Sequence, residues 1–196
     1  MTFDYETKKI AIIGTHNLGK TDFAVDVYRF LPYNNELVIN SARNMEIRGV
    51  KLGEDSTFAD QIEIIEEQIN QEQLAKEQRG RNHQKPSFII TDTSVIDLLV
   101  YMEYHSRHNP NFFDDNDERF NGLNHWRSRV SSHLKKEPYY RLFFATLDPK
   151  ERIEGFRKSI EDGIIDYIGT NDITYYKLPA NRNLWKQCVI ENIDNL

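Results

Sequence analysis

The sequence predicts an α/β fold in which a mainly parallel sheet of five strands lies between two layers of helices. Short β-branched apolar runs alternate along the chain with longer segments of helical periodicity. The apolar runs are continuous rather than alternating, which is typical of strands that are buried on both faces of a parallel sheet. The chain has 196 residues, of which 39% are hydrophobic, and this size suits one domain with its own core.

The elements follow from these patterns in chain order. The predicted strands cover residues 9–14, 36–40, 87–92, 139–147 and 173–178. The predicted helices cover residues 20–31, 57–79, a segment from about Thr93, 118–136, a segment from Asp148 and 181–194. No repeat or linker divides the chain. We therefore expect residues 1–196 to form one domain, with a flexible loop at about 106–117 and a lid at about 150–170.

The segment 57–79 is rich in Gln and Glu and contains no Gly or Pro. Its apolar residues at helical spacing are Phe58, Ile62, Ile65, Ile69 and Leu74. This narrow stripe predicts an amphipathic helix with a solvated outer face. A coiled coil is a weaker interpretation, because no further core residue continues the stripe regularly after Ile69.

Composition excludes several classes of protein. The net charge of −6 disfavours a general nucleic-acid binder, because such proteins need a basic face to neutralise phosphates. Cys188 is the only cysteine, so the chain can form neither an intrachain disulfide nor a zinc site built on cysteines. No apolar run approaches the length of a membrane span, and the first residues lack a secretory signal. We expect a cytoplasmic protein with no membrane partner.

The strongest motif follows the first predicted strand. It is Gly14-Thr15-His16-Asn17-Leu18-Gly19-Lys20-Thr21, which matches the P-loop pattern G-x4-G-K-[ST]. Its glycines let backbone N–H groups converge on an anion, and the following helix adds its positive end. Lys20 can reach the β- and γ-phosphates, and the Thr21 hydroxyl can bind Mg²⁺. The alternative is a glycine-rich turn with an incidental lysine, but the flanking strand and helix favour ATP binding by residues 14–21.

Polar residues follow the other predicted strands, where ligands bind in such sheets. Asp92 ends the third strand and can hold Mg²⁺, although an aspartate there could instead cap the next helix. We expect Asp97, one turn further on, to face solvent or to cap.

Basic residues follow the second and fourth predicted strands. Arg43 could bind a substrate phosphate or carboxylate, or lie on the surface. Arg152 and Arg157 could form a lid over phosphates, or a solvated helix face. His105 and His108 lack a third ligand at a suitable spacing, so the sequence does not predict a histidine metal site.

In these residues the chain resembles the AAA-type P-loop proteins close to the ribosylnicotinamide kinase domain of bifunctional NAD-biosynthesis regulators. It is more loosely similar to nucleoside and nucleoside-monophosphate kinases. The resemblance rests on GTHNLGKT, Asn40-Ser41-Ala42-Arg43, Asp92-Thr93-Ser94 and Glu154-Gly155-Phe156-Arg157. It implies a three-layer α/β/α P-loop NTPase fold, with ATP and Mg²⁺ bound and a nucleoside or nucleotide as phosphate acceptor. It also implies that Lys20, Asp92 and Arg157 are catalytic, that Thr21 and Asp92 bind metal, and that Asn40 and Arg43 bind substrate.

Two departures from the family pattern leave the function open. The family has a glutamate where this chain has Asn40, and an amide cannot act as a general base. The second acid of the family's Asp-Thr-Asp turn falls on Ser94. The main hypothesis is a small-molecule kinase. The alternative is an ATP-dependent switch or partner-binding module, with a protein partner or a second copy of the chain. A nucleic-acid kinase is disfavoured by the acidic charge.

Overall fold

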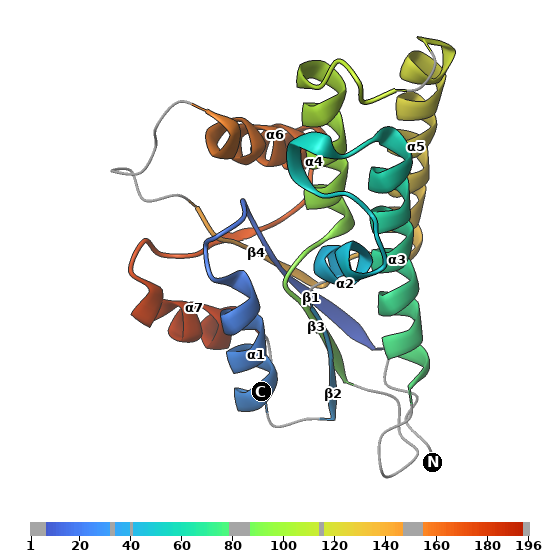
Figure 1. Cartoon of the computed structure of the whole chain (residues 1–196). Helices are drawn as coiled ribbons and strands as arrows, with labels where there is room; N and C mark the ends of the chain where they lie inside the picture. Colours follow the sequence, from blue (N-terminus) through green and yellow to red (C-terminus); the bar gives the residue numbers. More distant parts are fainter. Residues whose placement is uncertain are drawn as a thin grey trace.

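A computed structural model describes residues 7–31, 34–39, 41–78, 87–113, 116–146 and 155–193. The strands form one five-stranded sheet in the order β2-β3-β1-β4-β5, and every neighbouring pair is parallel. Their bounds are β1 (Lys8–Ile13), β2 (Asn35–Val38), β3 (Phe88–Thr91), β4 (Arg141–Phe144) and β5 (Tyr176–Lys177). Helices cover both faces of the sheet, so the predicted three-layer P-loop NTPase fold is confirmed (Figure 1).

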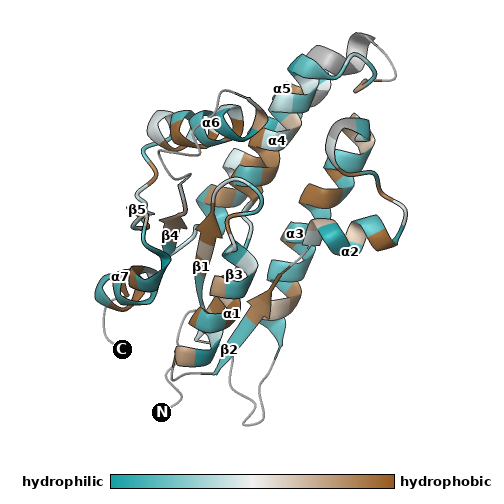
Figure 2. Ribbon diagram, turned by 60° about the vertical axis from the view of Figure 1, so that its left-hand side comes forward, coloured by the Kyte–Doolittle hydropathy of each residue, from teal (hydrophilic) through white to brown (hydrophobic). Residues whose placement is uncertain are grey.

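β1 lies at the centre of the sheet, and from Ile10 to Ile13 it is apolar on both faces. Successive side chains of a strand point to opposite faces, and Ile10 and Ile12 pack with α1 (Lys20–Phe30) and α7 (Trp185–Asn192). Ala11 and Ile13 pack on the other face, with α4 (Val95–His108) and α6 (Phe156–Thr170). Figure 2 shows the resulting pattern, with the brown arrows of β1 and β4 between the helical layers. The continuous apolar run therefore reflects burial from both sides.

The layer that contains α4 is extended by two long helices. α3 (Phe58–Glu77) packs against β2, β3 and α4, and α5 (Asn116–Lys136) packs against α4 from outside (Figure 1). An apolar cluster that includes the buried side chains of Phe112, Trp126 and Val130 fills the space between these helices. Within the described residues, no helix has both the length and the apolar character needed to cross a bilayer.

Several predicted boundaries differ from the structure. The short helix α2 (Ser41–Ile47) was not predicted, because it buries only Ser41 and Met45 and so shows no periodic stripe. β5 has two residues instead of the predicted span 173–178, and the last segment divides into the 3₁₀ turn η2 (Arg182–Leu184) and α7. A further 3₁₀ turn, η1 (Gly53–Asp55), precedes α3. The predicted helix start at Asp148 lies outside the described residues.

The segment expected to be a loop, 106–117, is partly helical. Residues 106–108 form the end of α4, and α5 begins at Asn116. Between them the side chain of Phe112 is fully buried, and the backbone carbonyl of Phe112 accepts a hydrogen bond of 2.7 Å from the Phe58 N–H. The described part of this segment is therefore packed against the start of α3.

The buried face of α3 is more polar than its apolar stripe predicts. Leu74 is 46% exposed, whereas Gln61, Gln68 and Glu72 are buried. The cause is Lys9 of β1, whose ammonium donates a 2.8 Å hydrogen bond to Glu72 Oε2. A buried lysine requires a partner, so the helix turns its carboxylate inward.

Glu72 is the centre of a buried hydrogen-bond network. Its Oε1 accepts hydrogen bonds from the Tyr139 hydroxyl at 2.7 Å and from Gln68 Nε2 at 2.8 Å. Gln68 Nε2 also donates to Thr91 Oγ1 at 3.0 Å and to the Thr93 carbonyl at 3.2 Å. The network therefore joins α3 to the carboxyl end of β3.

We expect Glu72→Ala to destabilise the fold by about 3–5 kcal/mol, because it leaves the buried Lys9 ammonium without its carboxylate. Urea denaturation would measure the loss. The control is Glu77→Ala on the exposed last turn of α3, for which a change within about 0.5 kcal/mol is expected. Similar small losses for the two variants would contradict a structural role for this ion pair.

Candidate nucleotide-binding site

The predicted P-loop forms a strand–turn–helix unit. β1 ends at Ile13, the loop covers residues 14–19, and α1 begins at Lys20. Gly14 has φ +134°, and a Cβ there would lie 2.3 Å from the Ala145 carbonyl oxygen. Gly19 has φ +72°, and a Cβ there would lie 2.2 Å from the Arg182 guanidinium. The positive φ favours glycine at both positions, and at Gly14 the nearby Ala145 backbone also leaves no room for a side chain.

The Lys20 ammonium lies inside this loop. It donates hydrogen bonds to the carbonyl oxygens of Gly14 at 2.8 Å and Thr15 at 2.6 Å. Burial lowers the pKa of Lys20, and the charge of Arg157 adds to this, although Asp97 and Asp92 oppose it. The loop thus holds a cation at the amino end of α1, where anions are stabilised.

Asp92 lies beside the P-loop at the carboxyl ends of two neighbouring strands. β3 pairs with β1, so the residue that follows β3 lies beside the loop that follows β1. The Thr21 hydroxyl donates a hydrogen bond to Asp92 Oδ2. A carboxylate and a hydroxyl are hard oxygen ligands, so this pair fits the predicted Mg²⁺ site. The alternative of Asp92 as the helix cap does not apply, because Ser94 is the N-cap of α4.

Asp97 is buried beside the P-loop. Its carboxylate closes the capping box with Ser94, so the capping expectation is confirmed, but the expectation that it faces solvent is wrong. Its Oδ1 accepts a hydrogen bond from the Gly14 N–H at 3.3 Å. Burial raises the pKa of Asp97 to about 7, although the positive charge of Lys20 acts in the opposite direction.

A cavity of about 360 Å³ opens next to Lys20. Its walls are mainly apolar and aromatic and come from the P-loop, α2, η1, α3, α4 and α6. The lining residues are Gly14, His16, Lys20, Ala42, Leu52, Gly53, Gln61, Ile64, Thr93, Asp97, Leu98, Tyr101, His105 and Phe156. A concave apolar site with a few polar groups is typical of small-molecule binding.

Aromatic rings form one wall of this cavity. The Phe156 ring lies 5.4 Å from the His16 ring and 5.7 Å from the Tyr101 ring, measured between centroids. The Tyr101 hydroxyl accepts a 3.0 Å hydrogen bond from the His16 backbone N–H. Burial, with the charges of Arg157 and Lys20, lowers the pKa of His16 and so favours its neutral imidazole. These contacts join the start of α6 to the P-loop.

Of the other predicted site residues, one lies near the P-loop, one is exposed and two lie outside the described residues. Arg157 lies in the first turn of α6, close enough to the P-loop for its charge to act on His16 and Lys20. Its buried Nε has no hydrogen-bond partner within the described chain. Arg43 is exposed on α2, and its neighbour Ala42 lines the cavity instead. Asn40 and Arg152 lie outside the described residues.

Sequence reasoning missed two residues that contact the loop. Tyr101 follows Asp97 by four residues, and residues at this spacing lie on the same face of a helix. This spacing was the available signal that Tyr101 lies on the side of α4 that carries Asp97. Arg182 lies far along the chain, yet its guanidinium donates a 3.1 Å hydrogen bond to the Gly19 carbonyl. The same guanidinium carbon lies 5.2 Å from the centre of the Trp185 ring. No local pattern marks Arg182, because only folding brings η2 to the P-loop.

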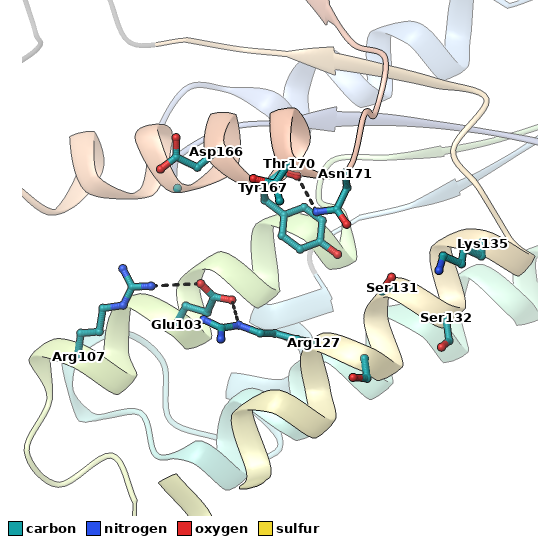
Figure 3. A pocket seen from close by; sticks show the side chains of 12 residues that line it. Glu103, Arg107, Arg127, Ser131, Ser132, Lys135, Asp166, Tyr167, Thr170 and Asn171 are labelled. Atoms are coloured by element: carbon teal, nitrogen blue, oxygen red, sulfur yellow. Dashed lines mark hydrogen bonds and ion pairs between the residues drawn. The ribbon is translucent and has the colours of Figure 1, made fainter. Parts of the chain in front are cut away.

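A larger cleft of about 630 Å³ lies between α4, α5 and α6, on the opposite face of α4 (Figure 3). A helix turns about 100° per residue, so Asp97 and Tyr101 face the P-loop cavity while Glu103 and Arg107 face the cleft. Glu103 pairs with Arg127 at 2.6 Å and with Arg107 at 3.5 Å. Both arginines already have a carboxylate partner. The smaller cavity, next to Lys20, is therefore the better candidate for phosphate chemistry.

Comparison with known proteins agrees with this geometry. A family model described as an AAA domain matches residues 9–154. Among curated protein sequences none matches this chain. Solved structures with the same fold include NadR in complex with NAD and AMP-PNP, at a TM-score of 0.72 and 14% identity, covering 97% of this chain and 51% of that chain.

Two further structures share the fold. NadR in complex with NR has a TM-score of 0.68 at 14% identity and covers 90% of this chain and 44% of that chain. Thymidylate kinase from Ehrlichia chaffeensis has a TM-score of 0.59 at 16% identity and covers 94% of this chain and 97% of that chain. The chain thus spans about half the length of the NadR chains and nearly the whole length of the thymidylate kinase.

We expect Lys20→Ala to weaken ATP binding about 10- to 100-fold, because it removes a charge-assisted hydrogen bond to phosphate. Isothermal titration calorimetry with ATP and Mg²⁺ would measure the affinity, and circular dichroism would show an intact fold. Lys136→Ala, on the exposed last turn of α5, serves as the control and should bind ATP normally. Unchanged binding by Lys20→Ala would contradict the P-loop assignment.

Proposed function

Since this chain belongs to the AAA-domain family whose model matches it, we propose that it is an ATP-dependent phosphotransferase that phosphorylates a nucleoside. The observation that carries the proposal is the position of the cavity. Lys20 lies both in the P-loop and in the cavity wall, so one end of the cavity is where a γ-phosphate would lie. An acceptor bound in the cavity would therefore lie next to the group to be transferred.

On the donor side, the triphosphate of ATP would bind residues 14–21. Lys20 would contact the β- and γ-phosphates, and Thr21 with Asp92 would hold Mg²⁺, which supplies positive charge at the phosphates when bound. Arg157 supports the same arrangement, since its charge acts on His16 and Lys20. Phosphoryl transfer depends mainly on positioning and on electrostatic stabilisation, which these groups would provide.

On the acceptor side, the walls favour a nucleoside, which carries no phosphate group, over a nucleoside monophosphate. The cavity volume of about 360 Å³ is close to the lower end of the usual range for ligand pockets, about 300–1,000 Å³. Tyr101 and Phe156 offer ring faces, and Gln61 offers an amide. Among the described lining residues no arginine is present, although recognition of a second phosphate group would favour one. The exposed position of Arg43 agrees with this interpretation.

The proposal predicts a product that can be detected directly. The protein would be incubated with ATP, Mg²⁺ and a panel of ribosylnicotinamide, adenosine, guanosine, cytidine, uridine and thymidine, with the matching 5′-monophosphates as a second panel. We expect mass spectrometry to find the monophosphate of a nucleoside together with ADP, and no conversion of an added 5′-monophosphate to its diphosphate beyond the ADP that ATP itself yields. Lys20→Ala should abolish the product.

The alternative of an ATP-dependent switch is motivated by Asn40, which replaces the family's acid. It predicts that ATP binds without any phosphorylated acceptor, and that a protein partner is retained in only one nucleotide state. Transfer to any nucleoside of the panel would contradict this alternative. Absence of transfer, with ATP binding intact, would contradict the kinase proposal.

We further expect Ala42→Leu to raise the KM for the nucleoside about tenfold or more, because the added carbons occupy the cavity. ATP affinity should stay within about threefold, since Ala42 is not part of the P-loop. Steady-state kinetics with each substrate varied in turn would separate the two effects. Asn44→Leu on the exposed face of α2 is the matched control. Equal effects on both substrates would count against acceptor binding in this cavity.

A further inference from the structure

The Asp97 side chain is the only carboxylate among the described residues that line the cavity. Only 1% of the residue is exposed. Each of its oxygens accepts a backbone hydrogen bond, Oδ1 from the Gly14 N–H at 3.3 Å and Oδ2 from the Ser94 N–H at 3.1 Å. Each carboxylate oxygen has two lone pairs, so each retains acceptor capacity, and Asp97 is one of the residues that line the cavity.

Other groups near the P-loop are less suited to accept a proton. Asp92 accepts a hydrogen bond from the Thr21 hydroxyl and belongs to the proposed Mg²⁺ site. His16 Nδ1 lies 3.3 Å from the Tyr101 hydroxyl, and the lowered pKa of the imidazole makes it a weaker base. Position 40, where the family has an acid, carries an amide. Asp97 remains as a buried carboxylate that faces the acceptor cavity.

The charged and titratable groups around Asp97 come from several elements. Lys20 acts on it from α1 and Asp92 from the end of β3. Asp97 in turn acts on Tyr101 of α4 and on Tyr139, which precedes β4. Burial raises the pKa of Asp97 to about 7, and Lys20 lowers it. A general base works best when its pKa lies near the working pH, because it is then substantially deprotonated and still has a sufficient driving force to accept a proton.

We propose that Asp97 is the general base that accepts the proton of the acceptor hydroxyl during phosphoryl transfer. This inference rests on the proposed kinase function. The acceptor O–H bond breaks and its proton passes to the Asp97 carboxylate. The acceptor oxygen forms a bond to the γ-phosphorus, the bond between that phosphorus and the bridging oxygen breaks, and ADP leaves with the electron pair. Asp97 then releases the proton to solvent.

The test compares Asp97→Asn with the wild type, using ATP and the nucleoside of the panel that gives the most product. In the wild type, kcat should fall about tenfold per pH unit below an apparent pKa near 7, because protonation removes the base. Asp97→Asn should lower kcat about 10²- to 10⁴-fold and abolish this acid limb. ATP affinity, measured by calorimetry, should stay within about threefold.

A second variant separates catalysis from structure, because Asp97 also closes the capping box of α4. Ser94→Ala removes the Ser94 hydroxyl that caps the Ile96 and Asp97 N–H groups, and leaves the Asp97 carboxylate in place. It should lower the melting temperature and retain the acid limb. An unchanged acid limb in Asp97→Asn, with product still formed, would overturn this inference alone. Absence of any product from the wild type would overturn it together with the proposed function.

Discussion

The site depends on the parallel pairing of β1 with β3. This pairing places the loop after β1 beside the turn after β3, two segments separated by about seventy residues in the sequence. Two side-chain contacts join them, one from Thr21 to Asp92 and one from the Gly14 N–H to Asp97. The P-loop, the Thr21–Asp92 pair and the cavity next to Lys20 all meet at this junction. The cavity next to Lys20 thus lies at the carboxyl ends of the parallel strands, where ligands usually bind in such sheets.

A buried polar network holds the turn after β3 in place beside the P-loop. Gln68 of α3 donates hydrogen bonds to the Thr91 hydroxyl and the Thr93 carbonyl, which flank Asp92 on either side. Gln68 is itself held by Glu72, which is paired with Lys9 of the central strand. Such networks stabilise a fold only when their members are satisfied, and they then fix one geometry. The polar face of α3 therefore orients the turn that carries Asp92.

Helix α4 relates the two concave regions of the molecule. One face carries Asp97 and Tyr101 toward the P-loop, and the other carries Glu103 and Arg107 toward the cleft in Figure 3. Gly163 of α6 lets the two helices approach closely, since a Cβ there would lie 2.7 Å from a methyl carbon of Val100. Helix α4, which lines the cavity next to Lys20, is thus packed closely against α6.

The sequence alone determined the sheet, the P-loop and the acid after β3. These features depend on local patterns, because a strand buried on both faces is continuously apolar and an anion loop needs glycines at fixed spacing. Tertiary structure decided the rest. Asp97 lies in the cavity rather than in solvent because α4 packs its first turn against Gly14. Arg182 reaches Gly19, and α3 turns Glu72 inward, because their partners are distant in sequence and no periodicity encodes such contacts.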